Sequence, residues 1–175
     1  MVVLERPQVR YPLAAVTYDH EEIRAVVETL EAGRTTMGPR VAGFERRFAE
    51  LVGARHAVMV NSGSSADLLL AFGLGPPGQR DEVLLPAVTW PTQISACVLA
   101  GYAVRLVDVD PNTLQMDADD LARKVTRRSA AIFVTHLLGN VGEMDAIAGV
   151  AAHHGLPILE DCWEALGARW GGRRV

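Results

Sequence analysis

Short apolar segments alternate with segments of helical pattern along most of this 175-residue chain. Near-continuous apolar strands separated by helices are typical of a mostly parallel sheet that helices cover on both faces. The sequence therefore predicts an α/β fold arranged as a three-layer sandwich. The expected strands cover residues 56–60, 82–85, 104–109, 130–135 and 157–159.

Helix start and stop signals flank these strands. Asp19 can cap a helix at its N-terminus, and Gly155 follows an apolar stripe of helical period. Residues 1–18 have no clear period, so we expect an irregular N-terminal arm that lies on another surface or another subunit. Residues 19–175 are expected to form one domain. The expected helices cover residues 19–32, 41–53, 64–74, 92–100, 117–124 and 143–154.

Composition narrows the classes of ligand. An apolar content of 49% predicts a real core, and a formal net charge of -4 gives no reason to expect nucleic acid or an anionic membrane as partner. The first residues lack the apolar core of a signal peptide, and no run of about 18 apolar residues occurs. We therefore expect a cytoplasmic protein that binds small molecules. Cys97 and Cys162 lack metal-ligand spacing, so we expect reduced thiols and no metal site.

Polar and aromatic features follow the expected strands at their carboxyl ends. They are the turn at residues 61–66, then Trp90, His136 and Asp161. In parallel sheets, ligands bind beyond the carboxyl ends of the strands, so we expect these features on one rim. His136 at this rim is equally compatible with a structural role and with a substrate contact.

The turn at residues 61–66 has the pattern of a phosphate cradle. Gly63 tolerates backbone angles that other residues avoid, and Ser64 or Ser65 can cap the following helix. The first N–H groups of such a helix point at an anion. An ordinary crossover between strand and helix has the same pattern.

A flat, phosphorylated, heteroaromatic cofactor would use all the features of the rim. Pyridoxal phosphate needs its phosphate at a helix N-terminus, its ring stacked, and a carboxylate beside its pyridine nitrogen. Trp90 supplies an aromatic ring on which the cofactor ring can stack, and Asp161 supplies the carboxylate. The simpler alternatives are a core aromatic for Trp90 and a helix cap for Asp161.

Several short motifs occur together, in one order, over nearly the whole chain. They are Thr36-Met37-Gly38-Pro39, Phe44-Glu45, Asn61-Ser62-Gly63-Ser64-Ser65-Ala66, Ala100-Gly101, Val107-Asp108-Val109-Asp110, His136-Leu137-Leu138-Gly139, and Glu160-Asp161 with Ala165-Leu166-Gly167-Ala168. This set resembles the DegT/StrS-type (DegT/DnrJ/StrS) sugar aminotransferases, which are fold-type I pyridoxal phosphate enzymes. The resemblance implies the large cofactor-binding domain of such an enzyme.

The resemblance also implies roles for individual residues. It implies that Gly63, Ser64 and Ser65 hold the cofactor phosphate. It implies that Trp90 stacks on the ring and that Asp161 pairs with the pyridine nitrogen. The implied cofactor is pyridoxal 5'-phosphate or pyridoxamine 5'-phosphate, and the implied assembly is a homodimer with its sites at the interface.

The family's catalytic lysine is expected beyond residues 171–175. Lys124, the only lysine in the chain, is a poor substitute because it lies in a charged helical stretch before a strand. The chain therefore resembles the N-terminal portion of these enzymes, without the Schiff-base lysine or the small C-terminal domain. We expect this portion alone to be inactive and its parent enzyme to be active.

The resemblance allows two reactions, and the lysine or histidine position that decides between them is expected beyond Val175. Transamination is the first expectation because aminotransferases dominate the family, and Glu164 is the departure that raises the alternative. In transamination, glutamate or glutamine supplies the amino group for a keto group on a nucleotide-linked sugar. Typical aminotransferases carry Gln or His near the cofactor hydroxyl, where this chain has Glu164. An acid there resembles the pyridoxamine-dependent sugar 3-dehydratases, in which histidine replaces the lysine. A non-catalytic or regulatory member of the family is a further alternative, whereas a nicotinamide-binding domain is disfavoured because G-x-G-x-x-G is missing.

Overall fold

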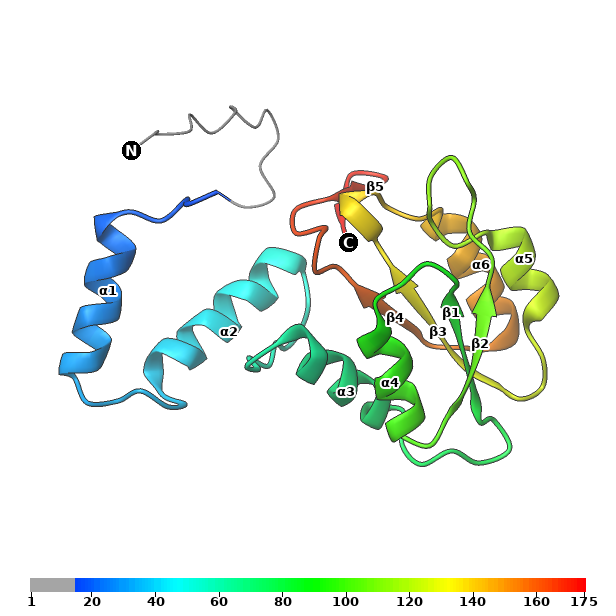
Figure 1. The fold of residues 1–175 in the computed structure, drawn as a ribbon, viewed down its shortest axis with the longest axis horizontal. Coiled ribbons are helices and arrows are strands. Elements are labelled where there is room, and N and C mark those ends of the chain that lie inside the picture. Colours follow the sequence, from blue (N-terminus) through cyan, green and yellow to red (C-terminus); the bar gives the residue numbers. More distant parts are fainter. Residues whose placement is uncertain (1–14) are drawn as a thin grey trace, which may run out of the picture.

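The computed structural model describes residues 15–175 (Figure 1). Most of the expected arm, residues 1–14, lies outside the described residues, and residues 15–18 are exposed and have no regular structure. The α-helices are α1 (His20–Glu31), α2 (Pro39–Val52), α3 (Gly63–Gly73), α4 (Pro91–Leu99), α5 (Ala118–Lys124) and α6 (Met144–His154), with a 3-10 helix η1 (Leu137–Gly139). The strands are β1 (Glu82–Pro86), β2 (Ala103–Val107), β3 (Ser129–Thr135), β4 (Ile158–Asp161), β5 (Arg169–Trp170) and β6 (Arg173–Arg174).

Four parallel strands form the main sheet in the order β2-β1-β3-β4. β1 and β3 are central, and their buried apolar residues form the near-continuous runs that the sequence predicted. All four strands end at one edge, where β3 closes on Thr135 and β4 on Asp161. This shared carboxyl edge brings together segments that are far apart in the sequence.

Helices cover both faces of the sheet, so the predicted three-layer α/β arrangement is confirmed. α3 and α4 pack on one face, through Ala71, Ala96 and Cys97 against Val83 and Phe133. α5 and α6 pack on the other face. That second core contains Leu84, Val107, Met116, Leu121, Ile132, Val134, Ile147, Ala151 and Leu156.

Local signals explain the helix ends. α1 begins at a capping box in which the Asp19 side chain accepts from Glu21 N and the Glu22 side chain accepts from Asp19 N. α6 ends at Gly155, which takes the left-handed conformation at φ 61°. None of the described helices is both long enough and apolar enough to cross a membrane.

The expected strand at residues 56–60 is wrong, because this segment pairs with no strand among residues 15–175. The N–H of Met59 instead donates to Glu45 Oε1 on α2 at 2.9 Å. Val58 and Met59 are exposed. An apolar alternating run becomes a strand only where a neighbouring strand completes the hydrogen-bond ladder.

A short antiparallel hairpin of β5 and β6, which was not expected, follows the sheet. Its loop is Gly171-Gly172, with φ of 54° and 81°. Two consecutive positive φ angles are what a tight hairpin turn requires, and glycine adopts them without steric cost.

Candidate functional site

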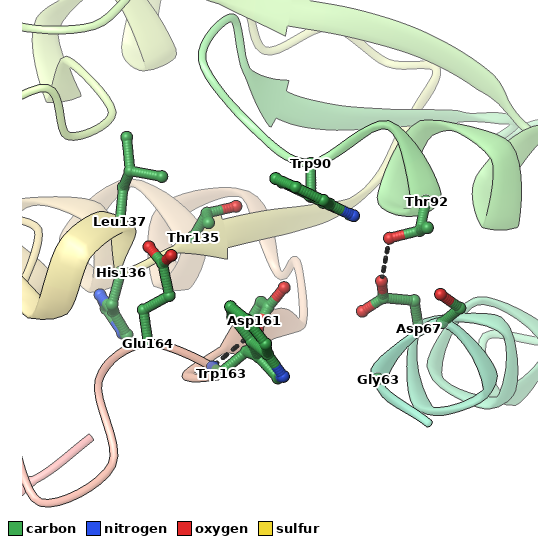
Figure 2. A pocket seen from close by; sticks show the side chains of 11 residues that line it. Gly63, Asp67, Trp90, Thr92, Thr135, His136, Leu137, Asp161, Trp163 and Glu164 are labelled. Carbon is green, nitrogen blue, oxygen red and sulfur yellow. Dashed lines mark hydrogen bonds between the residues drawn. The ribbon is translucent and has the colours of Figure 1, made fainter. Parts of the chain in front are cut away.

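A cavity of about 200 Å³ opens at the carboxyl edge of the sheet (Figure 2). It lies between the N-terminus of α3, the loop before α4, and the ends of β3 and β4. Its lining residues are Gly63, Ser64, Asp67, Trp90, Thr92, Thr135, His136, Leu137, Asp161, Trp163 and Glu164. The structure thus places the four predicted features at one rim.

The N-terminus of α3 forms one wall. Ser62 is the N-cap, and its side chain accepts from the Ser65 N–H at 3.2 Å. The Ser65 hydroxyl donates to Asn61 Oδ1 at 2.7 Å, and Ser65 does not line this cavity. Gly63 and Ser64 do line it, and within the described chain their N–H groups have no hydrogen-bond partner. An anion at this wall therefore meets two free backbone donors.

Two tryptophan rings form the aromatic part of the wall (Figure 2). Trp90 immediately precedes α4 and is 65% exposed, so it is not a core aromatic. Trp163, which the sequence analysis missed, is 75% exposed and lies beside Asp161. Large aromatic rings exposed at a cavity offer a flat ligand a surface for stacking.

Asp161 is the last residue of β4, and hydrogen bonds hold both of its carboxylate oxygens. Oδ2 accepts from Gln93 Nε2 at 2.6 Å, and Oδ1 accepts from the Trp163 N–H at 2.9 Å. No α-helix follows Asp161 within the described chain, so it is not a helix cap. Its carboxylate is a fixed acceptor at the cavity.

Asp67 is a second acid at the cavity, and the sequence analysis missed it. It is buried on α3, and its Oδ2 accepts from Thr92 Oγ1 at 2.9 Å. Burial raises the pKa of Asp67, the Thr92 hydrogen bond opposes that rise, and the negative charge of Asp161 adds to it. Its position one turn after Gly63, as the one charged residue of α3, is the signal that could have identified it.

Glu164 also lines the cavity, where it fixes the turn after β3. Its Oε2 accepts from the Leu138 N–H at 2.7 Å. Leu138 has φ 57°, a left-handed conformation that is uncommon for a leucine. The carboxylate of Glu164 therefore holds an unusual turn in place at the mouth of the cavity.

His136 is buried, and hydrogen bonds define its tautomer. Nδ1 accepts from the Gly142 N–H at 3.4 Å, so Nε2 carries the proton and donates to Glu160 Oε2 at 3.1 Å. These contacts hold the His136 ring at the cavity wall.

The same histidine belongs to a cluster with Glu160 and Cys162 whose donor atoms lie within 4.8 Å of one another. Metal ligation through Nε2 needs the opposite tautomer, with Nδ1 as a donor. Burial, and then the charges of Glu160 and Asp161, raise the pKa of the Cys162 thiol to about 11. In the hydrogen-bonded arrangement of the structure, the His136 Nε2 proton faces Glu160.

Lys124 lies outside the cavity. Its Nζ is 2.7 Å from Asp120 Oδ2 and donates to the Leu106 carbonyl oxygen at 2.9 Å. These contacts tie α5 to β2.

Together, the fold and the cavity define an α/β domain with free backbone donors, two aromatic rings and a fixed carboxylate at the carboxyl edge of a parallel sheet. Residues 16–175 match the model of the DegT/DnrJ/EryC1/StrS aminotransferase family. The chain belongs to this family, as its motifs predicted.

Several proteins whose names state a reaction are similar in sequence and structure to nearly all of this chain. The GDP-4-keto-6-deoxy-D-mannose 3-dehydratase of Yersinia pseudotuberculosis is 38% identical over 98% of this chain and 45% of its own length. A mutant of such a dehydratase (ColD), solved with GDP-perosamine bound, has a TM-score of 0.89 at 36% identity, over 94% of this chain and 44% of that one. A further structure of this enzyme, with a trapped PLP-glutamate geminal diamine, has a TM-score of 0.88 at 36% identity over the same shares. The chain spans less than half the length of the curated relatives it matches.

Proposed function

We propose that this chain is the cofactor-binding part of a pyridoxal phosphate-dependent enzyme that acts on a nucleotide-linked keto sugar. One observation carries the proposal. A single cavity joins free N–H groups at a helix N-terminus, an exposed tryptophan ring and a fixed carboxylate. Family membership and the ligands named for the dehydratase structures support the same cofactor and substrate class.

The residues at the cavity suit the cofactor. Gly63 and Ser64 would hold its phosphate through their free N–H groups, with Ser65 completing the first turn of α3. Trp90 would stack on the ring, and Asp161 would face the pyridine nitrogen. When bound, the cofactor supplies an electron sink for carbanion chemistry, while the protein binds and orients the reactants.

Of the two reactions, we propose removal of the sugar 3-hydroxyl group. An acid, Glu164, lines the cavity where typical aminotransferases of the family carry Gln or His. The similarity to GDP-4-keto-6-deoxymannose 3-dehydratases supports this choice. Glu164 is placed to keep the turn at Leu138 in position beside the reactants.

Transamination is the second candidate, supported by the description of the family as aminotransferases. Here glutamate or glutamine gives the amino group that a keto sugar finally receives. A cytoplasmic location fits either reaction, and either would need the catalytic residue that follows this cofactor-binding part in the family.

A homodimer is part of the proposal. Among residues 15–175, nothing buries a residue of α1, and this helix lies apart from the sheet (Figure 1). Ile23, Val26, Val27 and Leu30 form an exposed apolar stripe along it. A second copy of the chain would cover that stripe.

The product of the full-length protein distinguishes the reactions. The protein is incubated with pyridoxamine phosphate, glutamate and GDP-4-keto-6-deoxymannose, and the sugar product is identified by mass spectrometry. We expect the 3-deoxy sugar, whereas an amino sugar would establish transamination. Absence of saturable cofactor binding would overturn the whole proposal.

A further inference from the structure

Gln93 is a fully buried polar side chain in the first turn of α4, directly behind the cavity. Its Nε2 donates to Asp161 Oδ2 at 2.6 Å. Its Oε1 accepts from Thr135 Oγ1 at 2.9 Å and also contacts the Thr89 hydroxyl. Gln93 itself does not line the cavity.

The Asp161 carboxylate decides which way the Gln93 amide points, because its oxygens only accept and therefore face the NH2 group. The hydroxyl oxygens of Thr89 and Thr135 lie 2.8 Å apart, and each hydroxyl carries one proton. The carbonyl of the amide then faces the threonines, where Gln93 Oε1 accepts from a hydroxyl. The second hydroxyl can donate to the same oxygen or to the first hydroxyl, and both arrangements leave the NH2 group facing Asp161.

Hydrogen bonds thus hold the carboxylate of Asp161 at both oxygens, one from Gln93 and one from the Trp163 N–H. The donors come from different parts of the chain, α4 and the turn after β4. Thr135 at the end of β3 and Thr89 in the loop after β1 support the first donor. A network whose members are all satisfied fixes one geometry.

We propose that Gln93 is a positioning residue that holds the Asp161 carboxylate in the orientation required to meet the pyridine nitrogen of the cofactor. This inference rests on the proposed function, because it needs the cofactor in this cavity. Gln93 acts through Asp161 and touches no reactant. Its effect on the cofactor therefore depends on the presence of the Asp161 carboxylate.

A double-mutant cycle in the full-length protein tests this dependence. Gln93→Met keeps the length of the side chain and removes both hydrogen-bonding groups. We expect the Kd for pyridoxal phosphate, read from quenching of tryptophan fluorescence, to rise about tenfold. In the Asp161→Asn background, Gln93→Met should change the Kd less than about twofold. The absorbance spectrum of the bound cofactor should follow the same pattern.

Ser129→Ala is the matched control. Ser129 is fully buried at the opposite end of β3, and its hydroxyl accepts from the Thr126 N–H at 2.9 Å. Ser129→Ala also removes a buried hydrogen bond from β3, but at the end of the strand away from the cavity. The Kd for pyridoxal phosphate should therefore stay within about twofold of the wild-type value. Thr135→Val is a second variant should Gln93→Met fail to fold, and it should raise the Kd only where Asp161 is present.

The results of these experiments distinguish a wrong role for Gln93 from a wrong proposal that the cavity binds pyridoxal phosphate. Equal effects of Gln93→Met in both backgrounds would assign Gln93 a purely structural role and overturn the inference alone. A wild-type protein that binds no pyridoxal phosphate would overturn both.

Discussion

At the residue scale, Asp161 is the acid of the cavity whose two carboxylate oxygens are held by Gln93 and by the Trp163 N–H. Asp161→Asn keeps the size of the side chain and the acceptor that faces Gln93, but it removes the negative charge. In the full-length enzyme we expect turnover to fall about a hundredfold or more, because the pyridine nitrogen loses its counter-charge.

Phosphate anchoring by Gly63 and Ser64 does not involve Asp161, so the loss should fall on kcat more than on cofactor binding. Glu50→Gln, on the exposed surface of α2, is the control for replacing a carboxylate by an amide. Unchanged turnover in Asp161→Asn, measured by steady-state kinetics, would remove Asp161 from its proposed role.

The raised pKa of Asp67 predicts that the stability of the protein depends on pH. The pKa of Asp67 in the folded protein is raised above the ordinary value of 3.8, so the folded protein binds this proton more tightly than the unfolded chain does. Stability therefore falls as pH rises from 3.8 through the raised pKa, and the full cost is present at neutral pH.

Asp67→Asn should remove this cost, because an amide oxygen can still accept from the Thr92 hydroxyl. We expect a higher free energy of unfolding at pH 7, measured by urea titration, and no gain below pH 3.8. A variant that is less stable than wild type at pH 7 would contradict this account of Asp67.

Gln93 marks where prediction from the sequence ends. Gly63, Trp90 and Asp161 were predicted because each follows a strand or precedes a helix, and such positions share a rim. Gln93 lies inside a helix, and its importance arises from Thr135 on another strand. No local pattern encodes such a contact.

At the scale of elements, a cluster of charges joins α5 to β2. Asp120 Oδ2 accepts from the Asp108 N–H at 2.7 Å and lies 2.7 Å from Lys124 Nζ, and Oδ1 accepts from Arg123. The backbone hydrogen bond, followed by the Lys124 contact, lowers the pKa of Asp120. The stability from this shift is present above the ordinary pKa of 3.8 and is lost as pH falls through the lowered value.

Asp120→Asn should destabilise the protein by about 2 kcal/mol at pH 7, because it weakens hydrogen bonds to a charged group. The difference from wild type should shrink as the pH falls below 3.8. Asp119→Asn, at the adjacent exposed position, is the control and should have little effect. Urea titrations between pH 7 and pH 3 measure both, and a pH-independent difference would contradict the charge-based explanation.

Helices and strands could be predicted from the sequence wherever signals within the segment itself were sufficient. The helix at residues 19–32 was expected from Asp19 and appears as α1 with its capping box. The expected strand at residues 56–60 failed because its apolar pattern found no partner strand. A helix completes its hydrogen bonds within one segment, whereas a strand needs a second segment, so strands are harder to predict from local sequence.

At the scale of the whole molecule, α1 and α2 leave apolar surface uncovered. α1 buries no residue, and α2 buries only Ala49 among its fourteen residues. Apolar surface that residues 15–175 leave exposed is unfavourable in water, and the proposed second subunit would remove the stripe on α1 from solvent. α1 lies apart from the sheet (Figure 1) and contributes no residue to the lining of the cavity, so the proposed dimer can be tested with substitutions outside the site.

The double substitution Val26→Glu and Leu30→Glu makes that test. Both residues are exposed on the stripe, and glutamate is a good helix former, so α1 should stay intact. Two charges buried at an apolar interface without partners should raise the Kd of the dimer at least about tenfold. Arg24→Glu, at an exposed polar position of the same helix, is the control and should leave the dimer unchanged. Light scattering over a dilution series measures both, and an unchanged dimer in the double variant would place the subunit interface elsewhere on the molecule.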